Sequence, residues 1–386
     1  MKKQLLFVAG LMIAAPCSYG LDLVTAYQLA QKNDPTWQAN QLQYQVDQLN
    51  LGLAQGNLLP TVSVNANIIR KNQATNKNQA INIPGLENSN LVPSSSTQRQ
   101  ASVTALHPLF RWDAWQALNQ VKTSLSLSEI NLRLQQQQQI LNTAQAYFNV
   151  LRQQSLTQAY VEEEKALLEQ LNMMQAKLRQ GLVARSDVSE ADAQYQNARA
   201  NRIAGHVQVL LAQEQLEQMI GPYRENLAVL RADFDYQKPY PDNIQAWQDL
   251  AQSHNLSLQQ ARLQQQYAQD AKRVEQAARL PQVEAVASYG YNQQRPSSAI
   301  ANDGQFDQVG VEVNWNAFNG GRTKINIEKA QLSIEKAMAE VDAASRQANT
   351  EVRKAYMQVE TDQAKLKARL AAMQSAQHVS FASQAQ

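Results

Sequence analysis

The spacing of apolar residues along the chain changes from a helical period to an alternating one in four segments. Over most of the 386 residues, apolar positions recur three and four apart, which is typical of amphipathic helices. In residues 61–70, 97–106, 282–291 and 307–316, apolar and polar residues alternate, which is typical of strands with two unlike faces. The pattern therefore predicts a mainly helical chain that carries four strands of about ten residues each.

The predicted strands are suited to a membrane. About ten tilted residues cross the hydrocarbon core of a bilayer, and Tyr289, Tyr291 and Trp315 are residue types that lie at membrane interfaces. Because small closed barrels begin at about eight strands, a membrane-spanning chain with four must oligomerise. The alternative is a soluble sheet with one wet face. In the membrane reading, we expect lipid to contact Val62, Val64, Val283, Ala285, Val309, Val311 and Val313.

The two halves of the chain repeat the same order of elements. Residues 29–31 (LAQ) recur as 250–252, and Leu59 and Pro60 recur as Leu280 and Pro281, at an offset of 221 residues. This repetition predicts the domain organisation. We predict a signal peptide over 1–20, a first repeat over 21–221, a connector over 222–242 with a short strand near 227–230, and a second repeat over 243–386.

Helices fill most of the remaining sequence. One long helix is predicted before each strand pair, over 22–57 and 242–279, and one after it, over 113–180 and from 322 onward. A further helix over about 187–220 should fold back after a turn at Gly181. The run of glutamines at 135–139 predicts a solvated face. Apolar spacing predicts a coiled-coil seam through Leu141, Ala144, Tyr147, Phe148 and Leu151, and later through Leu167, Leu168, Leu171, Met174 and Leu178.

The N-terminal segment has the three parts of an export signal. Lys2 and Lys3 precede an apolar run over 5–15, and small residues follow at Ser18 and Gly20. We predict cleavage after Gly20, which removes Cys17, the only cysteine. The alternative is a lipoprotein acylated at Cys17, which the preceding proline disfavours. No apolar run after residue 15 is long enough for a membrane-spanning helix.

Composition and motifs predict no catalysis. The formal net charge is +2 and no long basic run is present, so nothing indicates nucleic-acid binding. The sequence contains no glycine-rich phosphate loop and no nucleophile elbow. The histidines lie far apart without metal-ligand spacing, at His107, His206, His254 and His378. We therefore predict a protein that is not an enzyme and needs no cofactor or metal.

A set of short motifs runs from about residue 23 to the C-terminus. They are 58–60 (LLP), 109–110 (LF), 140–144 (ILNTA), 146–151 (AYFNVL), 181–184 (GLVA) with Asp187 and Val188, 255–258 (NLSL) and 318–321 (FNGG). With these motifs the chain resembles the TolC family of trimeric outer-membrane efflux and secretion channels. The AYFNVL and GLV segments at this spacing are the most distinctive part of the resemblance.

The resemblance implies a fold and a function. The fold is a homotrimer that shares a twelve-stranded barrel in the outer membrane, four strands from each protomer, continued by a long α-helical tunnel in the periplasm. The function is a passive exit duct of an efflux pump or type I secretion system, coupled to an inner-membrane pump through a periplasmic adaptor protein. The alternative is an exported coiled-coil structural or binding protein with a soluble β-layer.

The turn near Gly181 is where the resemblance adds most. From the residues alone, Gly181 ends one helix in the left-handed conformation, and Asp187 with Glu190 caps the start of the next. The resemblance implies that this turn is the periplasmic tip, where Asp187 and Ser186 help to close the aperture. It also implies an adaptor-docking tip made by Gly181, Leu182 and Val183.

The second repeat is shorter than the first in this sequence. After the strands the offset drops to 208, because Phe110 matches Phe318. At that offset the counterpart of Gly181 falls at about position 389, beyond Gln386. We therefore expect that the second tip turn and its returning helix are missing, as in a fragment or a truncated reading frame.

Overall fold

A computed structural model describes residues 20–72, 95–230, 239–295 and 303–384, with side chains described up to residue 376. Most of the predicted signal peptide, including Cys17, lies outside the described residues. The chain is mainly helical, as predicted. In chain order the elements are α1 (Leu23–Asn33), α2 (Pro35–Gly56), β1 (Thr61–Asn72), β2 (Ser95–Phe110), α3 (Trp112–Arg179), α4 (Arg185–Ile220), α5 (Ile244–His254), α6 (Leu256–Ala277), β3 (Gln282–Arg295), β4 (Gly304–Asn314) and α7 (Arg322–Gln384).

The chain divides into two compact units. The first unit combines residues 1–43 with 132–242, and the second combines 44–131 with 243–386. The second unit therefore holds the strands of both predicted repeats. The predicted repeats are related by sequence, whereas the compact units are defined by packing.

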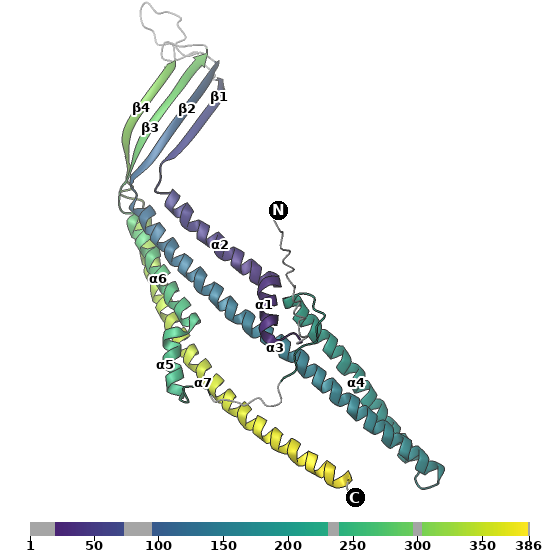
Figure 1. Cartoon of the computed structure of the whole chain (residues 1–386). Coiled ribbons are helices and arrows are strands. Elements are labelled where there is room, and N and C mark those ends of the chain that lie inside the picture. Colours follow the sequence, from purple (N-terminus) through teal and green to yellow (C-terminus); the bar gives the residue numbers. More distant parts are fainter. Residues whose placement is uncertain (1–19, 73–94, 231–238, 296–302, 385–386) are drawn as a thin grey trace, which may run out of the picture. The chain divides into compact units, whose positions relative to one another are not determined.

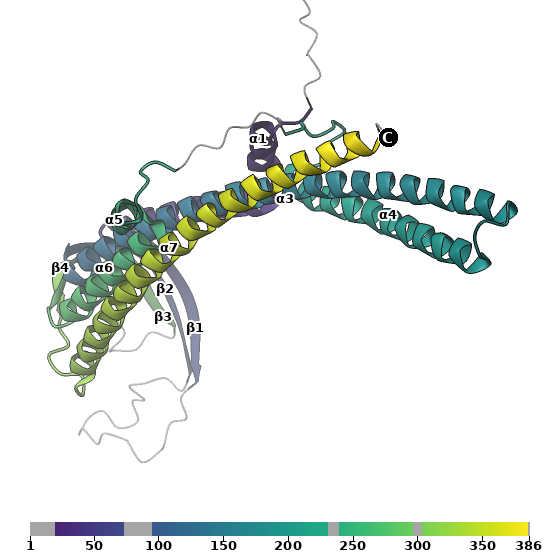
Figure 2. The ribbon, with the colours of Figure 1, turned by 90° about the horizontal axis from the view of Figure 1, so that it is seen from below.

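In the first unit, α4 packs along α3 as a helical hairpin (Figures 1 and 2). Four small residues of α4 recur every seventh position, Ala191, Ala198, Gly205 and Ala212, and all are buried. Small side chains let two helices approach closely. A Cβ atom added at Gly205 would lie 3.0 Å from Thr157 Oγ1 and from a ring carbon of Tyr160 on α3. Arg202 of α4 also forms an ion pair with Glu164 of α3.

The core of the first unit joins this hairpin to the N-terminal segment. It is built from Leu21, Ala26, Ala30, Tyr147, Val150, Ala212, Leu216, Ile220 and Leu227. The hydroxyl of Tyr147 lies 2.9 Å from the carbonyl oxygen of Leu21 and 3.1 Å from that of Ala228, and donates to them. Leu21 and Leu227 form a single parallel bridge, where a short strand near 227–230 was predicted. Tyr147 thus ties the N-terminal segment to the connector.

The seam predicted on α3 is wrong at Leu141 and Phe148, whereas predicted Tyr147 and Leu171 are buried. Leu141 is 54% exposed and Phe148 is 42% exposed, whereas Thr143 and Val150 are fully buried. Gln139 is also buried, and its Nε2 donates to the carbonyl oxygen of Ala30 over 3.2 Å. Residues 135–138 are exposed, so the solvated face ends one residue before the predicted position. Apolar spacing missed Gln139 and Thr143 because these two buried residues are polar.

Each helix predicted before a strand pair is broken once. Asp34 separates α1 from α2, and Asn255 separates α5 from α6; both have extended backbones (ψ 113° and 121°). Pro35 lacks the N–H that would continue α1 and disfavours the helical conformation at Asp34. Asn255 instead competes for the backbone, because its Oδ1 accepts from the N–H of Leu258 over 3.0 Å. The two breaks lie 221 residues apart, the offset of the repeat.

In the second unit, four antiparallel strands form one sheet in the order β1-β2-β3-β4 (Figure 1). Helices α6 and α7 lie side by side (Figures 1 and 2). Their cross-helix hydrogen bonds, Lys272 to Gln331 and Asn326 to Glu275, run in opposite chain order, so the pair is antiparallel. The buried alanines Ala261, Ala277, Ala337 and Ala348 allow the two backbones to approach closely.

Candidate functional site

The sheet brings the predicted lipid-contacting residues onto one face. Cross-strand partners share a face, and the register pairs Val64 with Val103, Val103 with Tyr289, and Val311 with Ala285. Val309 is 86% exposed and Val64 is 75% exposed, so nothing described covers them. We call this the apolar face: Val62, Val64, Ala66, Ile68, Ala101, Val103, Ala105, Val283, Ala285, Ala287, Tyr289, Tyr291, Val309, Val311 and Val313.

The opposite face of the sheet is polar. Ser63, Thr104, Ser288 and Gln308 form one row across the four strands. The hydroxyls of Thr104 and Ser288 lie 3.2 Å apart within hydrogen-bonding distance. Hydroxyl and amide side chains such as these can line a passage for water, whereas the apolar face cannot.

The predicted interface aromatics differ in their positions. Tyr289 and Tyr291 belong to the apolar face, whereas Trp315 lies just beyond the last residue of β4. The prediction that Trp315 belongs to the strand is therefore wrong. The Nε1 of Trp315 donates to the carbonyl oxygen of Arg279 over 3.1 Å, which fixes the indole where the chain leaves the sheet. Its ring is 59% exposed.

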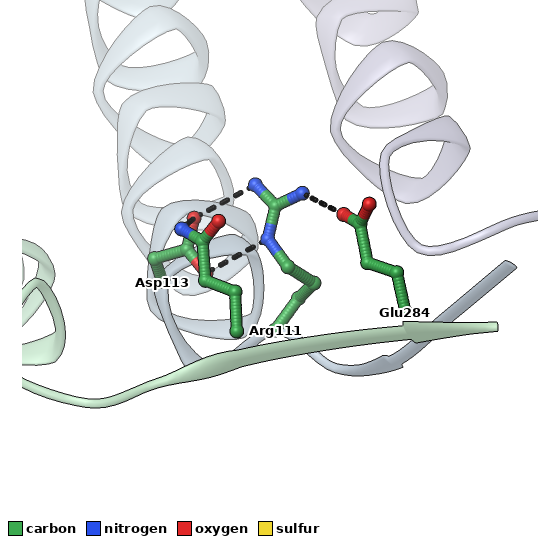
Figure 3. Close-up of polar contacts among 4 residues, drawn as sticks. Arg111, Asp113 and Glu284 are labelled. Atoms are coloured by element: carbon green, nitrogen blue, oxygen red, sulfur yellow. Dashed lines mark hydrogen bonds and ion pairs between the residues drawn. The ribbon is translucent and has the colours of Figure 1, made fainter. Parts of the chain in front are cut away.

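The passage from strand to helix is held by a charged network that the sequence analysis missed (Figure 3). Arg111 lies between β2 and α3, and its Nε and Nη2 donate to the two carboxylate oxygens of Asp113 over 3.1 and 2.9 Å. Its Nη1 donates to Glu284 of β3 over 3.0 Å. Gln282 adds a hydrogen bond from its Nε2 to Asp113 over 3.2 Å. The network fixes the start of α3 against the start of β3.

The network also reduces the repulsion between two carboxylates on the polar face. Glu284 lies directly opposite Glu312, and like charges in that position destabilise a sheet. Arg111 offsets part of this repulsion through its ion pair with Glu284, while it also pairs with Asp113. The hydrogen bonds from Arg111 also hold the pKa of Asp113 below its ordinary value, against the opposing effect of partial burial. The sequence feature that could have predicted this network is Arg111, a lone arginine between a predicted strand and a predicted helix.

The turn between α3 and α4 has the conformation predicted for Gly181. This glycine has φ +75°, and its N–H donates to the carbonyl oxygen of Leu178 over 2.9 Å. The N–H of Leu182 donates to Lys177 over 3.0 Å. These two bonds make a Schellman motif, which occupies carbonyls left free at a helix end. Lys177 and Arg179 lie in the last turn, where their positive charges interact favourably with the negative end of the helix dipole.

Asp187 caps α4 in a different way from the one predicted. The helix begins at Arg185, so Ala184 is the N-cap and Asp187 is the third helical residue. The Asp187 Oδ2 accepts from the backbone N–H of Ala184 over 3.1 Å, and the hydroxyl of Ser186 lies 3.2 Å from Oδ1. Glu190 takes no part in the cap. An alanine has no side-chain acceptor, so only the half of a capping box that reaches backward is present.

The remaining predicted tip residues are only partly exposed. Leu182 is 67% exposed, whereas Val183 is half-buried. An exposed leucine at the end of a hairpin suits contact with another protein. Across the residues that the structure describes, no group of three or more His, Cys, Asp or Glu side chains could hold a metal ion. Within those residues, no helix combines the length and the apolar character that crossing a membrane requires.

The fold and these sites define a class: mainly helical proteins in which long antiparallel helix pairs accompany a small sheet with one exposed apolar face. The family described as "Outer membrane efflux protein" matches residues 26–222 and 247–386. The chain therefore belongs to this family and is a protein of the outer membrane.

Individual relatives agree with this assignment. Outer membrane protein TolC of Escherichia coli is 29% identical over 345 residues, which cover 86% of this chain and 66% of TolC. The alkaline protease secretion protein AprF of Pseudomonas aeruginosa is 26% identical over 82% of this chain and 65% of AprF. The chain thus spans just under two thirds of the length of these relatives.

Solved structures share the fold at lower identity. The outer membrane protein VceC of Vibrio cholerae superposes with a TM-score of 0.70 at 15% identity, over 92% of this chain and 83% of VceC. The outer membrane channel CmeC of Campylobacter jejuni superposes with a TM-score of 0.71 at 17% identity, over 89% of this chain and 72% of CmeC.

Proposed function

We propose that the chain is one protomer of a passive exit duct that carries cargo from an inner-membrane pump across the outer membrane. The observation that carries this proposal is the sheet, whose apolar face is exposed on β1 and β4 while the opposite face carries hydroxyls and amides. Lipid requires the first kind of surface, and a water-filled passage requires the second. The residues of the apolar face contact lipid, and Tyr289, Tyr291 and Trp315 lie at the interfaces.

The duct is a homotrimer. Strands β1 and β4 are each paired on one side only within the described sheet, and four strands cannot close a barrel. Pairing β4 of one protomer with β1 of the next closes twelve strands from three copies. A stripe on α2 supports self-association: Leu42, Val46, Leu49 and Leu53 are 59%, 52%, 70% and 70% exposed. Their spacing of four, three and four is that of a coiled-coil seam without its partner.

The turn between α3 and α4 is the periplasmic end of the protomer. Asp187 and Ser186 take part in closing the aperture, and the adaptor protein docks on Gly181, Leu182 and Val183. The exposed carboxylate of Asp187 and the exposed Leu182 support these two roles. Each half of the chain, 21–221 and 243–386, supplies one strand pair to the barrel and helices to a periplasmic tunnel, and residues 222–242 connect them.

The cargo is either a small molecule or a secreted polypeptide. The family name refers to efflux, whereas the relatives AprF and PrtF are named for secretion of proteases. The relatives are named as outer-membrane and secretion proteins rather than as enzymes. We assign the chain no catalytic step and no cofactor, and energy comes from the pump.

Fractionation and conductance test this proposal together. The full chain is expressed with its N-terminal segment, and membranes are separated on a density gradient. We expect sedimentation with outer membranes, extraction only by detergent, and discrete conductance steps after insertion into a planar bilayer. Release of the protein by osmotic shock, without conductance, would instead support the exported coiled-coil protein with a soluble β-layer.

A further inference from the structure

Three arginines continue the apolar face of the sheet toward the ends of the strands that lie away from the helices. Arg70 follows Ile68 on β1, Arg99 precedes Ala101 on β2, and Arg295 comes four residues after Tyr291 on β3. Residues two or four positions apart on a strand lie on the same face, so each arginine shares the face of the apolar residue named with it. The apolar face therefore ends in a cationic rim, which we define as Arg70, Arg99 and Arg295.

The register brings these arginines close together. Arg70 and Arg295 both pair with Thr97 from opposite sides, so their Cα atoms are two strand spacings apart, or about 10 Å. Arg99 is two residues farther along β2 and is a diagonal neighbour of both, at about 7–8 Å. Guanidinium groups on side chains of this length can meet around one anion.

The charges of the rim are only partly neutralised. Arg295 forms an ion pair with Asp303. Arg70 and Arg99 have no hydrogen-bond or ion-pair partner among the residues that the structure describes, and both are exposed. Among the described strand residues, the acid of the same face is Asp307. It lies opposite Tyr289, which is six residues along β3 from Arg295 and thus about 20 Å away. As far as the described residues go, the guanidiniums of Arg70 and Arg99 are therefore available to an outside group.

The chemistry of that group follows from the location. If the apolar face contacts lipid, as proposed above, the rim lies at the level of the lipid headgroups. Arginine is tolerated there because the cost of placing it on the lipid face falls steeply from the middle of the bilayer to the interface. Its planar fork binds phosphate oxygens in pairs, which lysine cannot do. Ile68 and Tyr291 lie next to the rim and offer an apolar surface to the first part of an acyl chain.

We infer that Arg70, Arg99 and Arg295 form a binding site for the phosphate of a membrane lipid on the outer surface of the sheet. The inference rests on the proposed function, because it requires the apolar face to contact lipid. It adds a specific lipid partner that the barrel alone does not require. The site holds the phosphate by charge-assisted hydrogen bonds and holds the chain of the same lipid by apolar contact.

The test compares lipids that differ only in phosphate. The full chain in a neutral detergent is titrated with bis-phosphorylated lipid A, with its dephosphorylated form, and with inorganic pyrophosphate, and bound molecules are counted by native mass spectrometry. We expect phosphorylated lipid A to bind at least roughly tenfold more tightly than either control. The double variant Arg70→Gln/Arg99→Gln should lose this preference, and Arg70→Lys/Arg99→Lys should recover only part of it.

Lys71→Gln is the matched control. It removes one positive charge from the neighbouring residue, which the alternation of β1 puts on the polar face. We expect it to leave lipid affinity unchanged. Equal losses in Lys71→Gln and the double variant would overturn the site, as would equal binding of the two lipid A forms. Pyrophosphate binding as tight as that of lipid A would overturn the lipid as the source of the phosphate.

Failure of the phosphate site and failure of the proposed duct give different experimental results. A chain that sediments with outer membranes and conducts, but binds both lipid A forms equally, contradicts only the phosphate site. A chain that is released by osmotic shock and does not conduct contradicts the duct, whatever its lipid affinity in detergent.

Discussion

Single carboxylates in this chain owe their behaviour to one or two neighbouring groups. Asp187 is a helix cap whose carboxylate remains exposed, with bonds to Ala184 and Ser186. Asp113 is held by a bidentate contact from Arg111. Asp187 can exchange partners, because one backbone N–H and one exposed hydroxyl hold it. Asp113 is fixed by two bonds from Arg111 and one from Gln282. We therefore expect different effects from changing them.

Asp187→Ala should open the aperture if Asp187 closes it. The variant loses one capping bond to an exposed N–H, which costs about 0.5–1 kcal/mol of helix stability. It also removes the charge at the tip. We expect higher conductance in planar bilayers and entry of large antibiotics into cells. Glu190→Ala, which removes a nearby carboxylate that takes no part in the cap, is the control. Unchanged conductance in Asp187→Ala would leave this residue as a cap alone.

Acid should weaken the junction of strand and helix through Asp113. Its pKa is depressed in the folded chain, so its contribution to stability is present above the pKa of the unfolded chain and is lost as pH falls through the lower folded value. We expect wild type to lose more stability than Arg111→Gln as pH falls below about 4. At neutral pH, Arg111→Gln should cost about 1 kcal/mol, since the pair is partly exposed. Parallel acid-unfolding curves for the two proteins would contradict this role.

At the scale of elements, the strands could be predicted from the sequence more completely than the helices. Apolar and polar residues that alternate over ten positions predict a strand and also assign each residue to one of its two faces. The prediction therefore placed a set of valines on one common face, as the structure does: Val62, Val64, Val309, Val311 and Val313. The helix breaks at Asp34 and Asn255 were missed because a polar residue inside a helical pattern also fits a solvated position. The seam of α3 was predicted in part: Tyr147 is buried as expected, but Gln139 and Thr143 were missed because they are polar residues buried by their neighbours.

The two faces of β4 give an element-scale prediction. Val311 belongs to the apolar face and Glu312 to the polar face. Val311→Arg should cost about 2–4 kcal/mol if this position lies near the middle of the bilayer, and less near an interface. Glu312→Ala should leave stability nearly unchanged and alter conductance, because it changes the charge of the passage. Refolding into lipid vesicles and single-channel recording measure the two effects. Normal assembly of Val311→Arg with failure of Glu312→Ala would invert the faces.

At the scale of the whole molecule, the described chain leaves apolar surface that a monomer in water does not tolerate well. The stripe on α2 is the clearest case, because all four of its side chains are more than half exposed. The sequence indicated that the chain must associate if its strands span a membrane, since four strands cannot close a barrel. It did not indicate which helix takes part, because the spacing of this stripe is equally that of a helix packed within its own chain.

Leu49→Glu should separate assembly from folding. The change puts a charge in the middle of the α2 stripe and should weaken a coiled-coil seam between protomers. We expect the detergent-resistant oligomer to dissociate while helical content, measured by circular dichroism, stays the same. Gln48→Glu adds the same charge at the neighbouring position outside the stripe and should leave the oligomer intact. An oligomer equally stable in both variants would mean that α2 does not lie between protomers.

The helix starts and helix interruptions occur at equivalent positions in the two halves of the chain. Asp22 and Asn243 begin equivalent helices, and Asp34 and Asn255 interrupt them, each 221 residues from its counterpart. In all four residues the Oδ1 atom accepts the backbone bond, although aspartate in one half is asparagine in the other. This is the pattern expected of a duplicated unit in which the charge has changed and the acceptor has been kept. Each half is therefore a natural replicate of the other, against which an unexplained residue can be compared at its equivalent position.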